Sequence, residues 1–227
     1  MKKFYSVALL LLPAIITYSQ QLSQVSFAGG TTLTSIAFSA DQGVLIRVSE
    51  EGRIIEWGIE VKSLRYDYYA PALQPFPGKV NYYGQEGDSI SRGKIKSIGT
   101  TIITYYGPYE TAEKIGKIKS IGSLSFDYFS QYENTSLKGK IKQAGNLALD
   151  YYGAYENEGI RGKLKSVGNS SITYYSSFDD KAIRGKIKSI GGVSYTWYTS
   201  LEPGKIGGAL KTGSYRQNIN GITYILR

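Results

Sequence analysis

The chain has 227 residues, a formal charge of +9 at pH 7, 21 tyrosines, no cysteine and no histidine. The missing residue types exclude thiol catalysis, cysteine-based zinc sites and nucleophilic machinery built on histidine. Only carboxylate, tyrosine, lysine, serine and threonine chemistry remains, and no catalytic motif stands out, so we expect no enzyme, no cofactor and no metal site.

Residues 1–19 have the layout of a secretory signal peptide. Lys2 and Lys3 are followed by the apolar run VALLLLPAII (7–16), which is too short to span a bilayer, and by the small residues Thr17 and Ser19. We therefore expect export to the periplasm, the cell surface or the extracellular space. Cleavage after Ser19 would remove two lysines, lower the charge from +9 to +7, and leave no transmembrane segment.

Residues 20–51 are predicted to be capping strands. The stretches 25–39 and 43–47 are strand-like, and the turn signal SADQG (39–43) separates them. We expect them to start the sheet that the rest of the chain continues.

Residues 52–227 are predicted to be a repeat array, with regular copies over 93–207. The motif GKIKSIG and its variants recur every 23 residues. The segments GRIIEWG (52–58), GKVNYYG (78–84) and GGALKTG (207–213) resemble degenerate copies, and GITYIL (221–226) resembles a closing strand. The second glycine of the motif anchors each regular repeat and is found at Gly99, Gly122, Gly145, Gly168 and Gly191.

Each repeat is predicted to be a β-hairpin, because apolar and polar residues alternate with a period of two on both sides of the anchoring glycine. Copies side by side would bury a continuous apolar face. The fold class is therefore all-β: an antiparallel meander of consecutive 23-residue hairpins forming one extended, twisted or spiralling sheet.

Two hairpin registers fit the pattern. A two-residue turn at the glycine would set lysines opposite apolar residues. An odd loop or a bulge would pair Ile118 with Phe126 and leave lysines opposite polar residues such as Asp127. We favour the odd register, with Ile118 inside and Ser125 on the opposite face.

The combination Gly-Lys/Arg-Ile-x-x-Ile followed by a Tyr-rich strand resembles the YD repeats of Rhs-type secreted proteins. GRIIEW and RYDYY (65–69) are the closest local matches, over about residues 52–213. The Tyr-Asp pair is intact only at Tyr66-Asp67, and a second Asp-x-x-Gly turn is missing. The resemblance implies a spiral sheet of hairpins and transfers no functional residue. The MORN repeat, also a hairpin, is a poorer second match.

The loops between hairpins carry the candidate binding residues. An aromatic residue followed by an acid recurs at one pitch, as in carbohydrate platforms, where a ring covers the apolar face of a sugar and a carboxylate accepts its hydroxyl hydrogens. Packing of the rings in the loops is the alternative. The candidates are Tyr109, Glu110, Tyr132, Glu133, Tyr155, Glu156, Phe178 and Asp179.

Two lysine columns flank the first strand of each hairpin. With Tyr106, Tyr152 and Tyr175 they could bind an anionic polymer by charge and stacking, but we favour a solvated sheet face that guards against edge pairing. The columns are Lys94, Lys117, Lys140, Lys163 and Lys186, and Lys96, Lys119, Lys142, Lys165 and Lys188.

The sequence thus predicts a secreted or cell-surface, non-catalytic β-repeat protein with a structural or adhesive role. The alternative is a module that binds a glycan or an anionic envelope polymer through the loops or lysines. A carboxylate-based glycoside hydrolase is a second alternative, although paired acids such as Glu156/Glu158 and Asp179/Asp180 sit on single loops instead of facing each other across a cleft.

Overall fold

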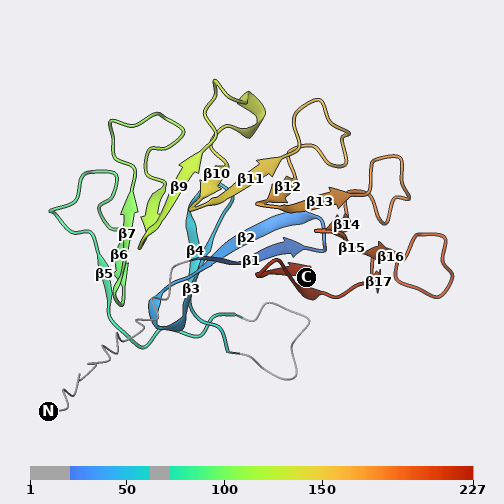
Figure 1. The fold of residues 1–227 in the computed structure, drawn as a ribbon, viewed down its shortest axis with the longest axis horizontal. Coiled ribbons are helices and arrows are strands. Elements are labelled where there is room, and N and C mark those ends of the chain that lie inside the picture. The colour runs from blue at the N-terminus through green and yellow to red at the C-terminus, as the bar shows by residue number, and fades with distance from the viewer. Residues whose placement is uncertain (1–20, 62–71, 227) are drawn as a thin grey trace, which may run out of the picture.

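The computed structural model describes residues 21–61 and 72–226, which form an all-β structure with two main sheets (Figure 1). The predicted signal peptide and the Tyr66-Asp67 pair lie outside these residues. The inner sheet has the strand order β18-β19-β1-β2-β3-β4, and its neighbours are antiparallel except β1 and β19, which pair in parallel. Its strands are β1 (Gln21–Ala28), β2 (Thr32–Ser39), β3 (Val44–Val48), β4 (Ile54–Ile59), β18 (Arg216–Ile219) and β19 (Ile222–Leu226).

The outer sheet contains the repeats. Its 11 strands follow one another in sequence order from β5 to β15, and β16 and β17 continue it as a separate pair. The predicted all-β meander of consecutive antiparallel hairpins is confirmed. The strands are β5 (Val80–Tyr82), β6 (Ile95–Ile98), β7 (Thr101–Tyr105), β8 (Ile118–Ile121), β9 (Leu124–Tyr128), β10 (Ile141–Ala144), β11 (Leu147–Tyr151), β12 (Leu164–Val167), β13 (Ser170–Tyr174), β14 (Ile187–Ile190), β15 (Val193–Ser194), β16 (Thr196–Trp197) and β17 (Leu210–Thr212).

The outer sheet curls around the inner one, and its long loops point outward (Figure 1). Two short 3₁₀ helices complete the secondary structure of the described residues, η1 (Asp41–Gly43) and η2 (Thr135–Leu137). Across residues 21–61 and 72–226, no helix has the length and apolar character needed to cross a membrane.

The sequence suggested that the N-terminal strands start the repeat sheet, but they do not. Residues 21–48 build the inner sheet, and the GRIIEWG segment adds β4 to it instead of forming a repeat. The closing strand over 222–226 also joins the inner sheet, beside β1. Alternating strands predict a sheet, but they do not tell which of two sheets a strand enters.

The hairpin register differs from the one we favoured. Ser120 pairs with Ser125 and Ile121 with Leu124, so the hairpin closes through a two-residue turn at the glycine. The bulge lies instead between repeats, where Thr104 pairs with Ser120 but Tyr105 pairs with Ile118. The strand skips one residue there, so Ile118 and Ile121 both face the core.

The predicted faces are nevertheless correct. Ile118 and Phe126 are buried, whereas Ser125 is exposed. The extra residue of the bulge, Lys119, is exposed as well. The bulge therefore allows a two-residue turn and an apolar inner face in the same repeat. Strict alternation with a period of two would not allow both.

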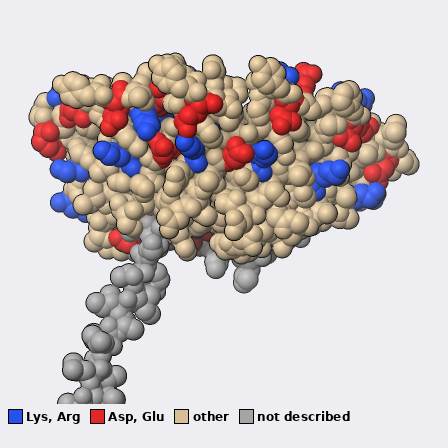
Figure 2. All heavy atoms as spheres, turned by 45° about the horizontal axis from the view of Figure 1, so that its top comes forward, with Lys and Arg blue, Asp and Glu red and all other residues tan. Residues whose placement is uncertain are grey.

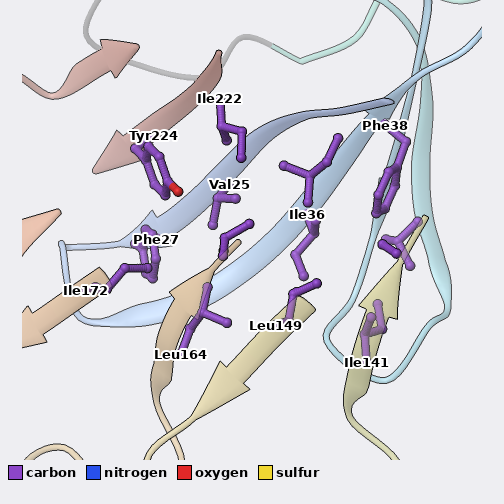
Figure 3. Close-up of a cluster of buried hydrophobic side chains, with 14 of the residues drawn as sticks. Val25, Phe27, Ile36, Phe38, Ile141, Leu149, Leu164, Ile172, Ile222 and Tyr224 are labelled. Carbon is purple, nitrogen blue, oxygen red and sulfur yellow. The ribbon is translucent and has the colours of Figure 1, made fainter. Parts of the chain in front are cut away.

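One hydrophobic core joins the two sheets. Figure 3 shows side chains of the inner sheet facing side chains of the repeats. A sheet with one apolar face can bury that face only against another layer. The inner sheet provides this second layer for the repeats. The facing residues include Val25, Phe27, Ile36 and Phe38 from the inner sheet and Ile141, Leu149, Leu164 and Ile172 from the outer sheet.

Two tight turns of the inner sheet dock on the repeats in the same way. The Gly52 carbonyl accepts the backbone N–H of Ile118 at 3.2 Å, and the Gly30 carbonyl accepts that of Ile187 at 2.7 Å. Both glycines have positive φ, +78° and +66°. A Cβ at Gly52 would lie 2.0 Å from the Tyr128 hydroxyl, and one at Gly30 would lie 2.3 Å from the Trp197 ring. Only glycine fits either site.

An aromatic ladder explains much of the tyrosine content. Tyr106 packs edge-on against Tyr128 of the next repeat, with ring centroids 6.1 Å apart, and donates its hydroxyl to the Phe126 carbonyl at 2.7 Å. Tyr152 makes the same contacts two repeats later, with Tyr174 and the Ile172 carbonyl. These contacts tie neighbouring hairpins together.

Candidate functional site

Four of the predicted aromatic residues stand at the tips of the loops, and we call them the loop-tip row: Tyr109, Tyr132, Tyr155 and Phe178. These residues are 101%, 90%, 106% and 91% exposed, so the rings have almost no packing contact with the described structure. The alternative that these rings pack in their loops is therefore wrong. Leu201, 84% exposed, continues the row one period further, as the 23-residue spacing alone could have indicated.

The acids beside three of these tips shape the loops. Glu133 accepts the backbone N–H of Ser130 at 3.1 Å, and Asp179 accepts that of Ser176 at 2.6 Å. In both loops the carboxylate closes a short turn directly after the exposed aromatic residue. Glu202 does the same with the N–H of Thr199, at 3.2 Å.

Glu133 is also held by a lysine. The Lys142 ammonium bonds to its carboxylate and, together with the Ser130 amide, lowers the pKa of Glu133 to about 2. The Glu133 carboxylate oxygens thus already have hydrogen-bond and ion-pair partners within the protein. They are less available to a ligand than the sequence pattern suggests.

Glu110 and Glu156 differ from these acids. Their loops have glycine, Gly107 and Gly153, where the other loops have serine or threonine. Among the described residues neither carboxylate has a hydrogen-bond or ion-pair partner, and both side chains are exposed. The eight predicted residues thus comprise four free rings, two free carboxylates and two carboxylates that are committed to the loop.

One member of the paired acids, Asp180, is used within the fold. Asp180 accepts the Ser200 amide at 2.9 Å and bonds its hydroxyl, and these hydrogen bonds lower the pKa of Asp180. The described part of the chain also holds no cluster of three or more acidic side chains placed to bind a metal ion.

The first lysine column is not a solvated face, contrary to expectation. Lys117 lies over the Tyr128 ring, 4.9 Å from its centroid, and donates to the Gly139 carbonyl of the next repeat. Lys186 lies 4.4 Å over Trp197 and donates to the Gly29 carbonyl of the inner sheet at 2.6 Å. Burial lowers the pKa of both lysines. The alternation of apolar and polar residues predicted that this column lies on the polar face. It did not indicate that an aromatic ring lies beneath each ammonium group.

The second column is more exposed but largely neutralised. Lys96 pairs with Glu86 at 3.2 Å and Lys165 with Asp150 at 3.5 Å. Figure 2 shows acidic and basic side chains intermingled on the face of the molecule that it presents. Tyr106, Tyr152 and Tyr175 are half-buried against the core, and a lysine of the second column lies over each ring, 5.6 to 5.9 Å from its centroid.

The row of exposed rings is therefore the arrangement that the fold leaves without an internal role, and the surface around it carries mixed charge. Aromatic rings on consecutive loops can stack on units of an extended ligand, and free carboxylates such as Glu110 can accept hydroxyl hydrogens. Neither a protein-family model, nor a curated protein, nor a solved structure matches this chain.

Proposed function

We propose that the protein is a secreted or cell-surface adhesive module, acting by binding and not by catalysis, and that the loop-tip row binds a neutral polysaccharide. The observation that carries this proposal is the full exposure of Tyr109, Tyr132, Tyr155 and Phe178. Exposing a large ring on one loop is ordinary, but four in register on consecutive loops mark an interaction surface.

The charge distribution favours a neutral polymer over an anionic one. The first lysine column is turned to rings and carbonyls, and members of the second are paired with acids. An anionic polymer would need cations that are free to replace its counterions. Sugar rings need only flat apolar faces and hydroxyl acceptors, which the row provides.

A row of repeated sites can bind a polymer even when each single site binds weakly. One ring and one carboxylate hold a sugar at only about millimolar strength, but linked sites on one polymer raise the effective concentration. We therefore expect measurable affinity for long chains and very little for mono- or disaccharides.

The test is a triple substitution, Tyr109→Ala, Tyr132→Ala and Tyr155→Ala. A glycan array first identifies a bound polysaccharide, and affinity electrophoresis in gels containing it then measures binding. We expect single variants to weaken retention modestly and the triple variant to abolish it, with an unchanged melting temperature.

The matched control replaces three exposed aliphatic residues away from the loop tips, Ile55, Val61 and Ile102, by alanine. This variant should bind as the wild type does. Equal binding by the triple tyrosine variant and this control would refute the role of the row, and retention only in gels of acidic polysaccharide would favour the anionic alternative.

A further inference from the structure

A cavity of about 680 Å³ lies away from the loop tips, between the inner sheet and the first repeats. It is of the size that holds a small organic ligand. The turn between β3 and β4 and the start of β4 form one wall, and the loops before β6 and β8 form the other. Its apolar lining comes from Ile54, Trp57, Ile90, Ile95, Tyr105 and Ile115.

Three cations and no acidic side chain of the described residues line this cavity: Arg53, Lys94 and Lys117. The Lys94 ammonium donates to the Gly116 carbonyl, and neither it nor Lys117 is in an ion pair among the described residues. The Arg53 side chain is exposed and makes no hydrogen bond or ion pair within the described chain.

The carboxylates that act on these lysines are in no ion pair with them. Asp88 is already bound to the backbone N–H groups of Ile90 and Ser91, at 2.9 and 2.7 Å, and acts on Lys94 only at a distance. Glu51 and Glu113 act on Lys117 in the same way, and burial still lowers the pKa of both lysines. Each ammonium has three donors and uses one of them on a carbonyl, so a small anion inside the cavity can still take another.

The cavity also coincides with a repeat position that has no inner-sheet acceptor. At three of the five regular repeats the N–H group of this position, in Ile118, Ile141 and Ile187, donates to a carbonyl of an inner-sheet turn, and Leu164 is the other repeat position without one among the described residues. Ile95 is the equivalent residue of the first regular repeat, and it lines the cavity. Among the described residues no inner-sheet carbonyl reaches the Ile95 N–H, so a ligand oxygen could take that place.

We propose that this cavity binds a small amphipathic carboxylate, with its apolar body against Trp57 and Ile115 and its carboxylate toward Arg53, Lys94 and the Ile95 N–H. Charge selects the head group, because the lining carries cations and no acid. The apolar wall selects the body, since a bare anion would leave Trp57 and Ile115 uncovered. The proposal is independent of polysaccharide binding at the loop tips.

The test uses sodium decanoate as the probe, with decanol and acetate as the two half-ligands. Isothermal titration calorimetry measures binding, and tryptophan emission reports on the site, because Trp57 lines the cavity and the only other tryptophan, Trp197, is buried. We expect decanoate to bind at least about tenfold more tightly than either half-ligand and to change the emission of the wild type but not of Trp57→Phe.

Arg53→Gln should weaken decanoate binding about tenfold, which corresponds to about 1.4 kcal/mol. The matched control is Arg161→Gln, an exposed arginine that does not line the cavity, and it should bind as the wild type does. Three results would overturn the proposal: no binding of decanoate, equal affinity for decanol, or equal weakening by the two arginine variants.

Discussion

Two columns of aromatic residues run through the same repeats at the same pitch, and they have opposite environments. Tyr128 and Trp197 belong to the inner column, which is buried under a lysine and against the inner-sheet turns. Tyr132 belongs to the loop-tip row, four residues after Tyr128, and is 90% exposed. Repetition alone therefore does not indicate function, because packing accounts for the first column and leaves the second unexplained.

The largest expected effect comes from a charge on the inner face. Ile118→Asp should unfold the protein, because an unpaired carboxylate in the core costs about 5 kcal/mol or more, a large part of the stability of a domain. Ser125→Asp, on the opposite face of the same hairpin, should be nearly silent. Thermal unfolding followed by circular dichroism checks this, and equal melting temperatures for the two variants would contradict the faces described here.

A matched pair of tyrosines tests the two columns directly. Tyr128→Ala should lower the free energy of unfolding by about 3–5 kcal/mol, because it removes a buried ring that fills the space over Gly52. Tyr132→Ala should change it by no more than about 0.5 kcal/mol. Urea unfolding measures both, and a large loss for Tyr132→Ala would make the loop-tip row part of the architecture.

Alkaline pH gives a smaller and more specific effect on the inner column. Burial raises the pKa of Tyr128 far above its usual value of 10. Between pH 10 and that raised pKa the unfolded chain releases a proton that the folded chain keeps, so stability falls as pH rises. In Tyr128→Phe this fall should be shallower by about 1.4 kcal/mol per pH unit.

The same Tyr128→Phe variant should also lose about 1 kcal/mol at neutral pH, because the hydroxyl donates to the Ile118 carbonyl at 2.8 Å. Urea unfolding at pH 8, 10 and 11 separates the two effects. The lysines with lowered pKa contribute the opposite slope, but equally in both proteins. Parallel pH profiles would mean that Tyr128 ionises in the folded state.

The sequence was sufficient for the repeat unit and its faces, because a period of two and a fixed 23-residue spacing are local signals. It was insufficient for the bulge between repeats. The pairing of Tyr105 with Ile118 depends on how one hairpin meets the next, and the alternation within one hairpin does not record that.

The inner sheet was beyond prediction for a similar reason. The parallel pairing of β1 with β19 joins Phe27 to Leu226, nearly the full length of the described chain apart. No local pattern specifies such a partner. In the candidate site the four rings are exposed and remain candidates for binding. The structural use of Glu133 and Asp179 could not be predicted, because it depends on the turn geometry of each loop.

The docking of the two inner-sheet turns has a consequence for how this protein can evolve. Ile118 and Ile187, which donate to the Gly52 and Gly30 carbonyls of the two turns, lie three repeats of 23 residues apart. Each hairpin adds two strands, about 10 Å of sheet width. In an open solenoid a unit can be gained or lost while its neighbours still stack. Here a duplication or deletion between these two residues would move one docking site by about 10 Å while the inner sheet kept its width. The width of the inner sheet thus fixes the number of repeats between the two docking sites. Recombination between near-identical repeats can easily change that number in the gene, but selection would remove the products because they could not fold in this way.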